Sequence, residues 1–201
     1  YDVDGLDVTH ARFPRASVPR GLFACTCPHC AAQADGLGYD MEAMLKALQS
    51  GQKRLRSLDG GFLARLSWTG AGFFDYLHLM GLAGGVVDWF LFRSELLATQ
   101  IARFREAVRD RAGANFCFGA DTYPASLAPL VGHNITAWDR HSDFASPLVS
   151  HISSFVADGL IAWACWLEGE TNGLGEADAL QAVYRFAGYD GMGMPETVAG
   201  Y

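Results

Sequence analysis

Strand-like and helix-like segments alternate along this chain, and that order limits the folds open to it. In residues 5–9 apolar and polar side chains alternate with the two-residue period of a strand, whereas apolar residues between 87 and 112 recur at helical spacing. A helix that separates two strands in this way is typical of parallel βα units, so we predict an α/β fold. The predicted strands are 5–9, 115–121 and 144–150, and the main predicted helices are 41–48, 87–112, 152–167 and 176–186.

Two segments between these elements carry loop chemistry. Residues 15–38 combine prolines and glycines with three cysteines, which predicts a long Cys-containing loop with at most one helical turn. Residues 60–85 mix glycines with aromatic side chains, which favours a packed insertion with short helices over a linker.

The charge balance excludes some classes of partner. Lys and Arg number 15 against 22 Asp and Glu, so the formal net charge is −7. With no extended basic run, we expect neither a nucleic-acid surface nor a surface for anionic membranes. Neutral or cationic small molecules remain possible ligands, and the sequence does not indicate an oligomeric state.

The hydropathy, the cysteines and the start of the sequence bear on the compartment of the protein. No apolar run reaches the roughly 18 to 20 residues that cross a bilayer, so we expect a soluble protein. The free cysteines and the lack of a visible export signal favour the cytoplasm. The chain opens without Met, two residues before a predicted strand region, so we interpret it as a probable fragment of a longer protein.

The sharpest local motif is Cys25-Thr26-Cys27-Pro28-His29-Cys30. Three thiols within six residues can converge on one ion, and Zn²⁺ favours such ligands, so we predict a structural zinc site that needs one further ligand. Cys27-Pro28-His29-Cys30 is also the dithiol pattern of thiol–disulfide oxidoreductases, which belongs at a helix N-terminus after a central strand. Cysteines without a special role are the third interpretation. Cys117 and Cys165 lie in apolar runs and are predicted to be core thiols.

Polar side chains at the predicted strand ends form a second candidate site. Asp7, Asp121 and His151 each lie at or near the carboxyl end of a predicted strand, and in a parallel α/β fold these ends share one edge. His10 and Arg12 can join them if the first strand has ended before His10. The alternatives are structural: Asp121 could cap a turn, and Asp7 could pair with Arg12.

Residues 4–14, of sequence DGLDVTHARFP, and the cysteine motif together resemble a known protein family. They are similar to the fourth-strand region of glycoside-hydrolase-like TIM barrels of bacterial type, and the loop spacing resembles the zinc cluster of family 42 β-galactosidases. The segments ending at 118–124 and 143–148 look like the fifth and sixth strands of the same barrels. The resemblance therefore implies a partial (β/α)8 barrel, with residues 1–201 forming a single incomplete domain from about strand 4 to the region before strand 7.

The same resemblance implies a function. It suggests a carbohydrate-active hydrolase of unknown substrate, with Asp7 and Asp121 catalytic, His10, Arg12 and His151 binding a sugar, and zinc on Cys25, Cys27 and Cys30. Thr9 stands where related strands carry a carboxylate, and a hydroxyl cannot protonate a leaving group, so Asp7 is the nearest substitute. A second catalytic carboxylate from a later strand would lie beyond Tyr201, so we expect the chain alone to be inactive. The alternatives are a noncatalytic carbohydrate-binding or structural barrel and a thiol–disulfide oxidoreductase using Cys27 and Cys30.

Overall fold

A small parallel sheet runs through one end of the molecule. The computed structural model describes residues 3–66, 73–82, 84–149 and 152–201. Its strands are β1 (Gly5–Val8), β2 (Cys117–Thr122) and β3 (Phe144–Pro147), in the spatial order β1-β2-β3. Both pairs are parallel, with Asp7 opposite Gly119 and Asp121 opposite Ser146. The predicted strand order is confirmed.

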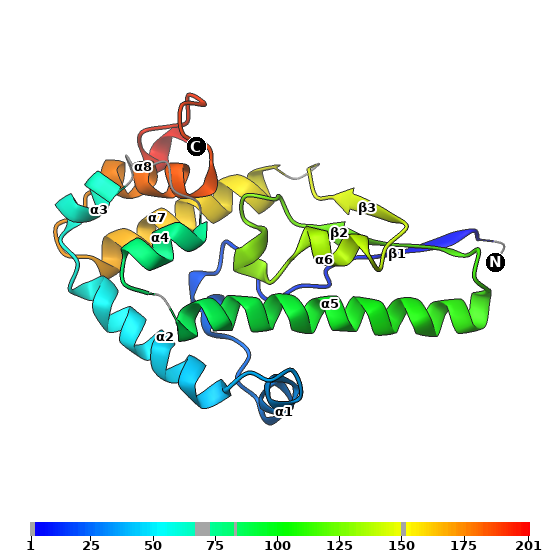
Figure 1. Cartoon of the computed structure of the whole chain (residues 1–201). Helices are drawn as coiled ribbons and strands as arrows, with labels where there is room; N and C mark the ends of the chain where they lie inside the picture. The colour runs from blue at the N-terminus through cyan, green and yellow to red at the C-terminus, as the bar shows by residue number, and fades with distance from the viewer. Residues whose placement is uncertain (1–2, 67–72, 83, 150–151) are drawn as a thin grey trace.

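The predicted barrel is wrong. The described residues contain a single sheet of three strands, which stays open, with β1 and β3 as its two edges. The reason is that most helices pack on one another: α2 (Met41–Arg56) packs on α5 (Gly85–Ala112), and both α7 (Asp158–Glu170) and α3 (Gly60–Leu66) pack on α8 (Glu176–Ala187). Figure 1 shows α2, α3, α7 and α8 gathered at one end and the sheet extending towards the N-terminus at the other, with α5 running alongside the sheet. The protein is a mixed α/β fold in which helices dominate.

The helices account for most of the remaining chain. Among the described residues, those that begin at residue 85 or later are α5 (Gly85–Ala112), α6 (Ile135–Asp139), α7 (Asp158–Glu170) and α8 (Glu176–Ala187). Short 3-10 turns, η1, η3 and η5, span Pro19–Phe23, Ala128–Val131 and Val198–Gly200, and a π-turn, η4, spans Ser153–Ala157 and leads into α7. None of the described helices is both long and apolar enough to cross a bilayer.

The predicted loop at 15–38 is partly wrong. It contains η1 and a nine-residue helix, α1 (Pro28–Gly36). The prolines that suggested a loop start both elements, because a proline at the first helical position has no N–H to leave unpaired. In the predicted insertion at 60–85 the structure has α3 (Gly60–Leu66) and α4 (Phe73–Leu79), while residues 67–72 and 83 lie outside the described part of the chain.

The two best-predicted helices follow their sequence signals. Asp40 caps α2 (Met41–Arg56), because its Oδ1 accepts a hydrogen bond of 2.9 Å from the Ala43 N–H. Met44, Leu48 and Leu55 of α2 are buried, as the helical spacing requires. α5 ends at Gly113, whose φ of 97° lies in the left-handed region that favours glycine.

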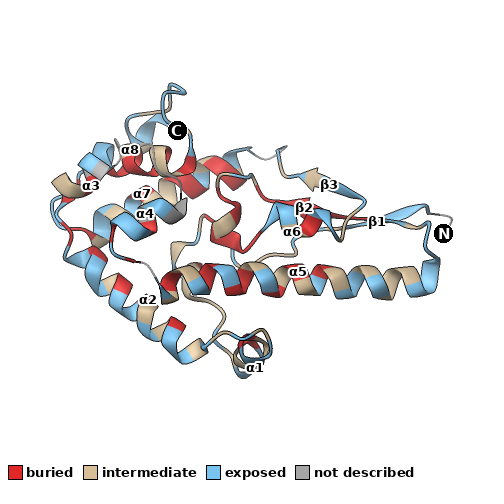
Figure 2. Ribbon diagram, in the orientation of Figure 1, coloured by how far each residue is buried: buried red, intermediate tan, exposed pale blue. Residues whose placement is uncertain are grey.

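The molecule has two apolar cores. The larger lies among α2, α5, α7 and α8, and the smaller joins Phe118 and Ala120 of β2 to Ala98 and Ile101 of α5. Because side chains alternate across a strand, Asp7, Gly119, Asp121, Phe144 and Ser146 share the opposite face of the sheet. Figure 2 shows β1 exposed and the buried residues of α5 in its first part, from Val86 to Ile101.

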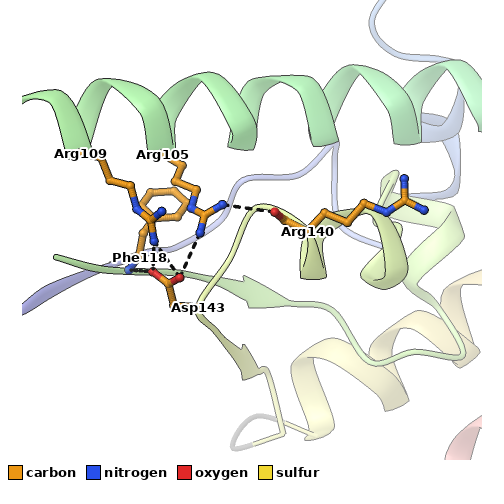
Figure 3. Close-up of polar contacts among 5 residues, drawn as sticks. All are labelled: Arg105, Arg109, Phe118, Arg140 and Asp143. Carbon is orange, nitrogen blue, oxygen red and sulfur yellow. Dashed lines mark hydrogen bonds and ion pairs between the residues drawn. The ribbon is translucent and has the colours of Figure 1, made fainter. Parts of the chain in front are cut away.

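Asp143 fastens β3 to β2 and α5. Its carboxylate accepts hydrogen bonds from Arg105 (3.1 Å), from Arg109 (2.9 and 3.0 Å) and from the Phe118 N–H (2.9 Å), as Figure 3 shows. The Phe118 N–H, followed by Arg109, lowers the pKa of Asp143. Asp143 also donates its own N–H to the Phe118 carbonyl at 2.7 Å, so this residue sets where β3 begins.

Candidate functional site

The three cysteines of the motif converge. The Sγ atoms of Cys25, Cys27 and Cys30 all lie within 4.8 Å of one another, and the group could hold a metal ion. Cys30 is buried in the larger core, whereas Cys25 and Cys27 are partly exposed. The predicted clustering of these thiols is therefore confirmed.

Local structure explains this convergence. Cys25 lies between η1 and α1, Cys27 is the N-cap of α1, and Pro28 is the first helical residue. Cys30 then lies one turn into the helix, and its side chain returns towards the N-cap because helical side chains tilt towards the N-terminus. His29 is not a member of the group and is exposed.

The thiols of Cys27 and Cys30 have pKa values shifted in opposite directions. The Cys30 N–H, followed by the Cys25 and Cys30 side chains, lowers the pKa of Cys27 to about 7. Burial, followed by the neighbouring thiols, raises the pKa of Cys30. A thiolate at Cys27 is the form that binds a metal or attacks a disulfide, so the geometry accommodates both chemistries.

The two remaining cysteines lie elsewhere. Cys117 begins β2 and Cys165 lies in α7, and neither belongs to the cluster. The prediction that they are core thiols is wrong, because both are exposed. They provide natural controls for the cluster.

The strand-end residues form a second polar group, which we call the strand-end site: Asp7, His10, Arg12, Asp121 and Ser146. Asp7 is exposed on β1, and its Oδ2 accepts a hydrogen bond of 2.7 Å from the Ser146 hydroxyl on β3. This bond spans β2 and joins the two edge strands, and on the same face the Phe144 ring covers Gly119, where a Cβ would lie 2.3 Å from that ring. The alternative pairing of Asp7 with Arg12 is not among the contacts of the described residues.

Asp121 is the buried member of the strand-end site, at 7% exposed. Burial, followed by the charge of Asp7, raises the pKa of Asp121. The His10 N–H donates to this carboxylate and opposes that rise. His10 has φ of 62°, a strained conformation for a residue with a side chain, so the backbone is bent here with its N–H towards Asp121.

Arg12 stands beside this carboxylate. Its guanidinium carbon lies 5.9 Å from the ring centroids of Tyr123 and Phe155, and its charge acts on Asp121. Burial lowers the pKa of Arg12, but the side chain remains a cation at neutral pH. The structure thus brings Asp7, Asp121, His10 and Arg12 together, whereas His151 lies outside the described residues.

Two residues that serve this region were missed. Ser146 could have been found from the strand register, because it stands opposite Asp121 in the neighbouring predicted strand. His133 had no sequence signal. Its Nδ1 accepts from the Tyr123 N–H and its Nε2 lies 3.0 Å from the Ala11 carbonyl, so it links the segments that follow β1 and β2.

Comparison with protein-family models, curated proteins and solved structures finds no match to this chain. The likeness to glycoside-hydrolase-like proteins therefore depends on the motif residues alone.

Proposed function

We propose that Cys25, Cys27 and Cys30 bind one structural zinc ion. The observation that carries the proposal is the convergence of their three Sγ atoms within 4.8 Å. With Zn–S bonds of about 2.3 Å, a tetrahedral ion sets sulfurs about 3.8 Å apart, so small side-chain movements suffice. An all-thiolate set favours zinc over oxygen-seeking cations such as Mg²⁺ or Ca²⁺.

A structural role follows from what α1 lacks. The helix has nine residues and buries only Cys30 and Ala34, so its apolar packing is small. Isolated helices of this length are marginal in water. An ion bound by Cys25, which precedes the helix, by the N-cap Cys27 and by Cys30, the third helical residue, would fix the start of α1 without a larger core.

The oxidoreductase alternative is supported by the position of Cys27 at a helix N-terminus, but not by the segment that precedes this residue. Cys27 is at a helix N-terminus and has a lowered thiol pKa, as such enzymes require. The segment before it, however, is the 3-10 turn η1 and not a central strand, and a third thiol stands within reach. Three converging thiols suit an ion better than a dithiol exchange.

Metal analysis of the purified chain tests the proposal. We expect about one zinc per chain, X-ray absorption with sulfur at about 2.3 Å, and loss of the metal in Cys25→Ser and Cys27→Ser. Cys117→Ser and Cys165→Ser are the matched controls and keep the zinc. Absence of metal together with a Cys27–Cys30 disulfide that exchanges with small thiols would instead favour the oxidoreductase.

A second proposal concerns the strand-end site, which we propose binds a neutral carbohydrate as part of a carbohydrate-active protein. Carboxylates and a hydroxyl from three strands offer hydrogen-bond partners for sugar hydroxyls. Phe144, 41% exposed on the same face of the sheet, offers an aromatic ring for the apolar face of a sugar. If the protein acts on glycosides, Asp121 with its raised pKa suits the acid and Asp7 the nucleophile or base.

Calorimetry with neutral monosaccharides and their methyl glycosides tests this second proposal. We expect Asp7→Asn and Asp121→Asn to weaken binding at least tenfold without lowering the melting temperature. Asp4→Asn is the matched control, because Asp4 is exposed and precedes β1. A lower melting temperature with unchanged affinity would assign Asp7 a purely structural role, and absence of binding at millimolar sugar would refute the proposal.

A further inference from the structure

A cavity lies among the helices, and among the described residues no member of the cysteine cluster or of the strand-end site lines it. Its volume is about 90 Å³, and its walls come mainly from α2, α5, α7 and α8. We call it the interhelical cavity and define it by Gly51, Gln52, Phe90, Trp163, Trp166 and Phe186.

The chemistry of the walls is uniform. Among the described residues that line the cavity, Gln52 is the one with a polar side chain other than the indoles, and none is charged. A water molecule needs two to four polar partners to occupy a cavity, so this one does not favour water. An apolar molecule is the occupant that such walls favour.

The aromatic side chains in the walls indicate which class of apolar molecule the cavity favours. Phe23, Phe90, Trp163, Trp166 and Phe186 all line the cavity, and the two tryptophan rings already meet edge to face at 5.2 Å. Aromatic rings prefer such edge-to-face or offset contacts with one another, which adds to simple burial. A further ring placed among them gains contacts that an aliphatic molecule of the same size does not.

The sequence of α2 contributes space to the cavity. Gly51 is in the interior of this helix, where glycine is less favourable than alanine. A Cβ at this position would lie 3.1 Å from Leu82 and 3.6 Å from Val86, both of which line the cavity. The helix therefore accepts an unfavourable residue at the wall, where any larger one would intrude.

From the volume and the walls we infer that the interhelical cavity binds one uncharged aromatic ring. An engineered closed apolar cavity of about 150 Å³ takes up benzene. This cavity has about 90 Å³ but is open to solvent, so it can take one ring with part of the ring exposed, and nothing larger. Several lining residues, among them Gln52, Trp166 and Phe186, are partly exposed, so a ring can enter from solvent. A carboxylate on the ring would find no cation in the described walls.

Benzene, cyclohexane and benzoate, each added to the whole chain, test the inference. We expect saturable binding of benzene, at least tenfold weaker binding of cyclohexane and none of benzoate. The indole NMR signals of Trp163 and Trp166 shift, while that of Trp89, which is fully buried but does not line the cavity, stays in place. Absence of benzene binding overturns the inference, and equal affinity for cyclohexane overturns the aromatic selectivity.

A variant pair checks the location. Ala182→Leu, in α8 at the cavity wall, should abolish benzene binding, whereas Ala125→Leu, exposed outside the cavity, should leave it unchanged. If Ala182→Leu does not fold, as judged by circular dichroism, Gly51→Ala replaces it, since the nearest atom to the new methyl group is a leucine side-chain carbon. Benzene affinity that survives a folded wall variant would overturn the assignment to this cavity.

Discussion

Acidification should destabilise the protein through His133. This side chain is 4% exposed and uses both ring nitrogens: Nδ1 accepts from the Tyr123 N–H, and Nε2 donates to the Ala11 carbonyl, each at 3.0 Å. Only the neutral ring can make both bonds, because a protonated Nδ1 has no lone pair left to accept. Burial disfavours the charged ring and lowers the pKa of His133 from 6.5 to about 4.

The sign and size of the effect follow from that shift. Because the folded state binds its proton less readily than the unfolded state, the contribution is complete above pH 6.5 and is lost as the pH falls towards 4. At about 1.4 kcal/mol per pKa unit, the free energy of unfolding should fall by about 2 to 3 kcal/mol between pH 7.5 and 4.5 from this group alone.

A variant isolates His133 from the carboxylates, which titrate in the same range. Urea unfolding of the wild type and of His133→Gln, which cannot titrate, is measured at both pH values. The stability advantage of the wild type should shrink by about 2 to 3 kcal/mol at the lower pH. Two parallel curves, with a constant difference across the pH range, would refute the reasoning.

Three further predictions concern Asp143, Gly119 and the proposed zinc ion. Asp143→Ala should lower the free energy of unfolding in urea by about 1 to 2 kcal/mol, because the Phe118 N–H loses its acceptor and Arg105 and Arg109 lose their ion-pair partner. Asp139→Ala, on the neighbouring helix, should cost less. Gly119→Ala places a Cβ 2.3 Å from the Phe144 ring and should cost about 1 kcal/mol or more, but little in a Phe144→Ala background, which a double-mutant cycle measures. If zinc is bound at a hundredfold excess over its dissociation constant, a chelator should lower the free energy of unfolding by about 2.7 kcal/mol, and unchanged stability would argue against a structural ion.

Local patterns in the sequence predicted the elements better than the architecture. The strands and the helices α2 and α5 follow from periodicity and from Asp40 and Gly113 at helix ends. Periodicity does not count strands, however, nor does it show which face of a helix meets which neighbour. The barrel was predicted from the motif resemblance. The structure instead has an open sheet of three strands and helices that pack mainly on one another.

The candidate sites show the same division. The cysteine cluster was predictable because its ligands are close in sequence and a single turn brings them together. Pro28 was misread as a loop residue, although proline is favoured at the first helical position and no β-branched residue follows it before Gly36. His133 could not be predicted, since its partners are backbone groups 10 and 122 residues away.

The segment between β1 and α1 links the two candidate sites, and its anchors explain how both stay in place. The Trp163 indole donates to the Ala16 carbonyl and the Trp89 indole to the Leu22 carbonyl, each at 2.7 Å, which ties the segment to α7 and α5.

Near the strand-end site, the guanidinium of the fully buried Arg93 lies 4.2 Å from the Phe13 ring centroid, and the Phe13 N–H donates to the Val131 carbonyl. A buried cation over an aromatic ring is favourable, and burial lowers the pKa of Arg93 to about 9. These anchors come from the helical core and not from the sheet. The open sheet can therefore carry the strand-end site without a closed barrel around it, because the helices hold the chain that follows β1.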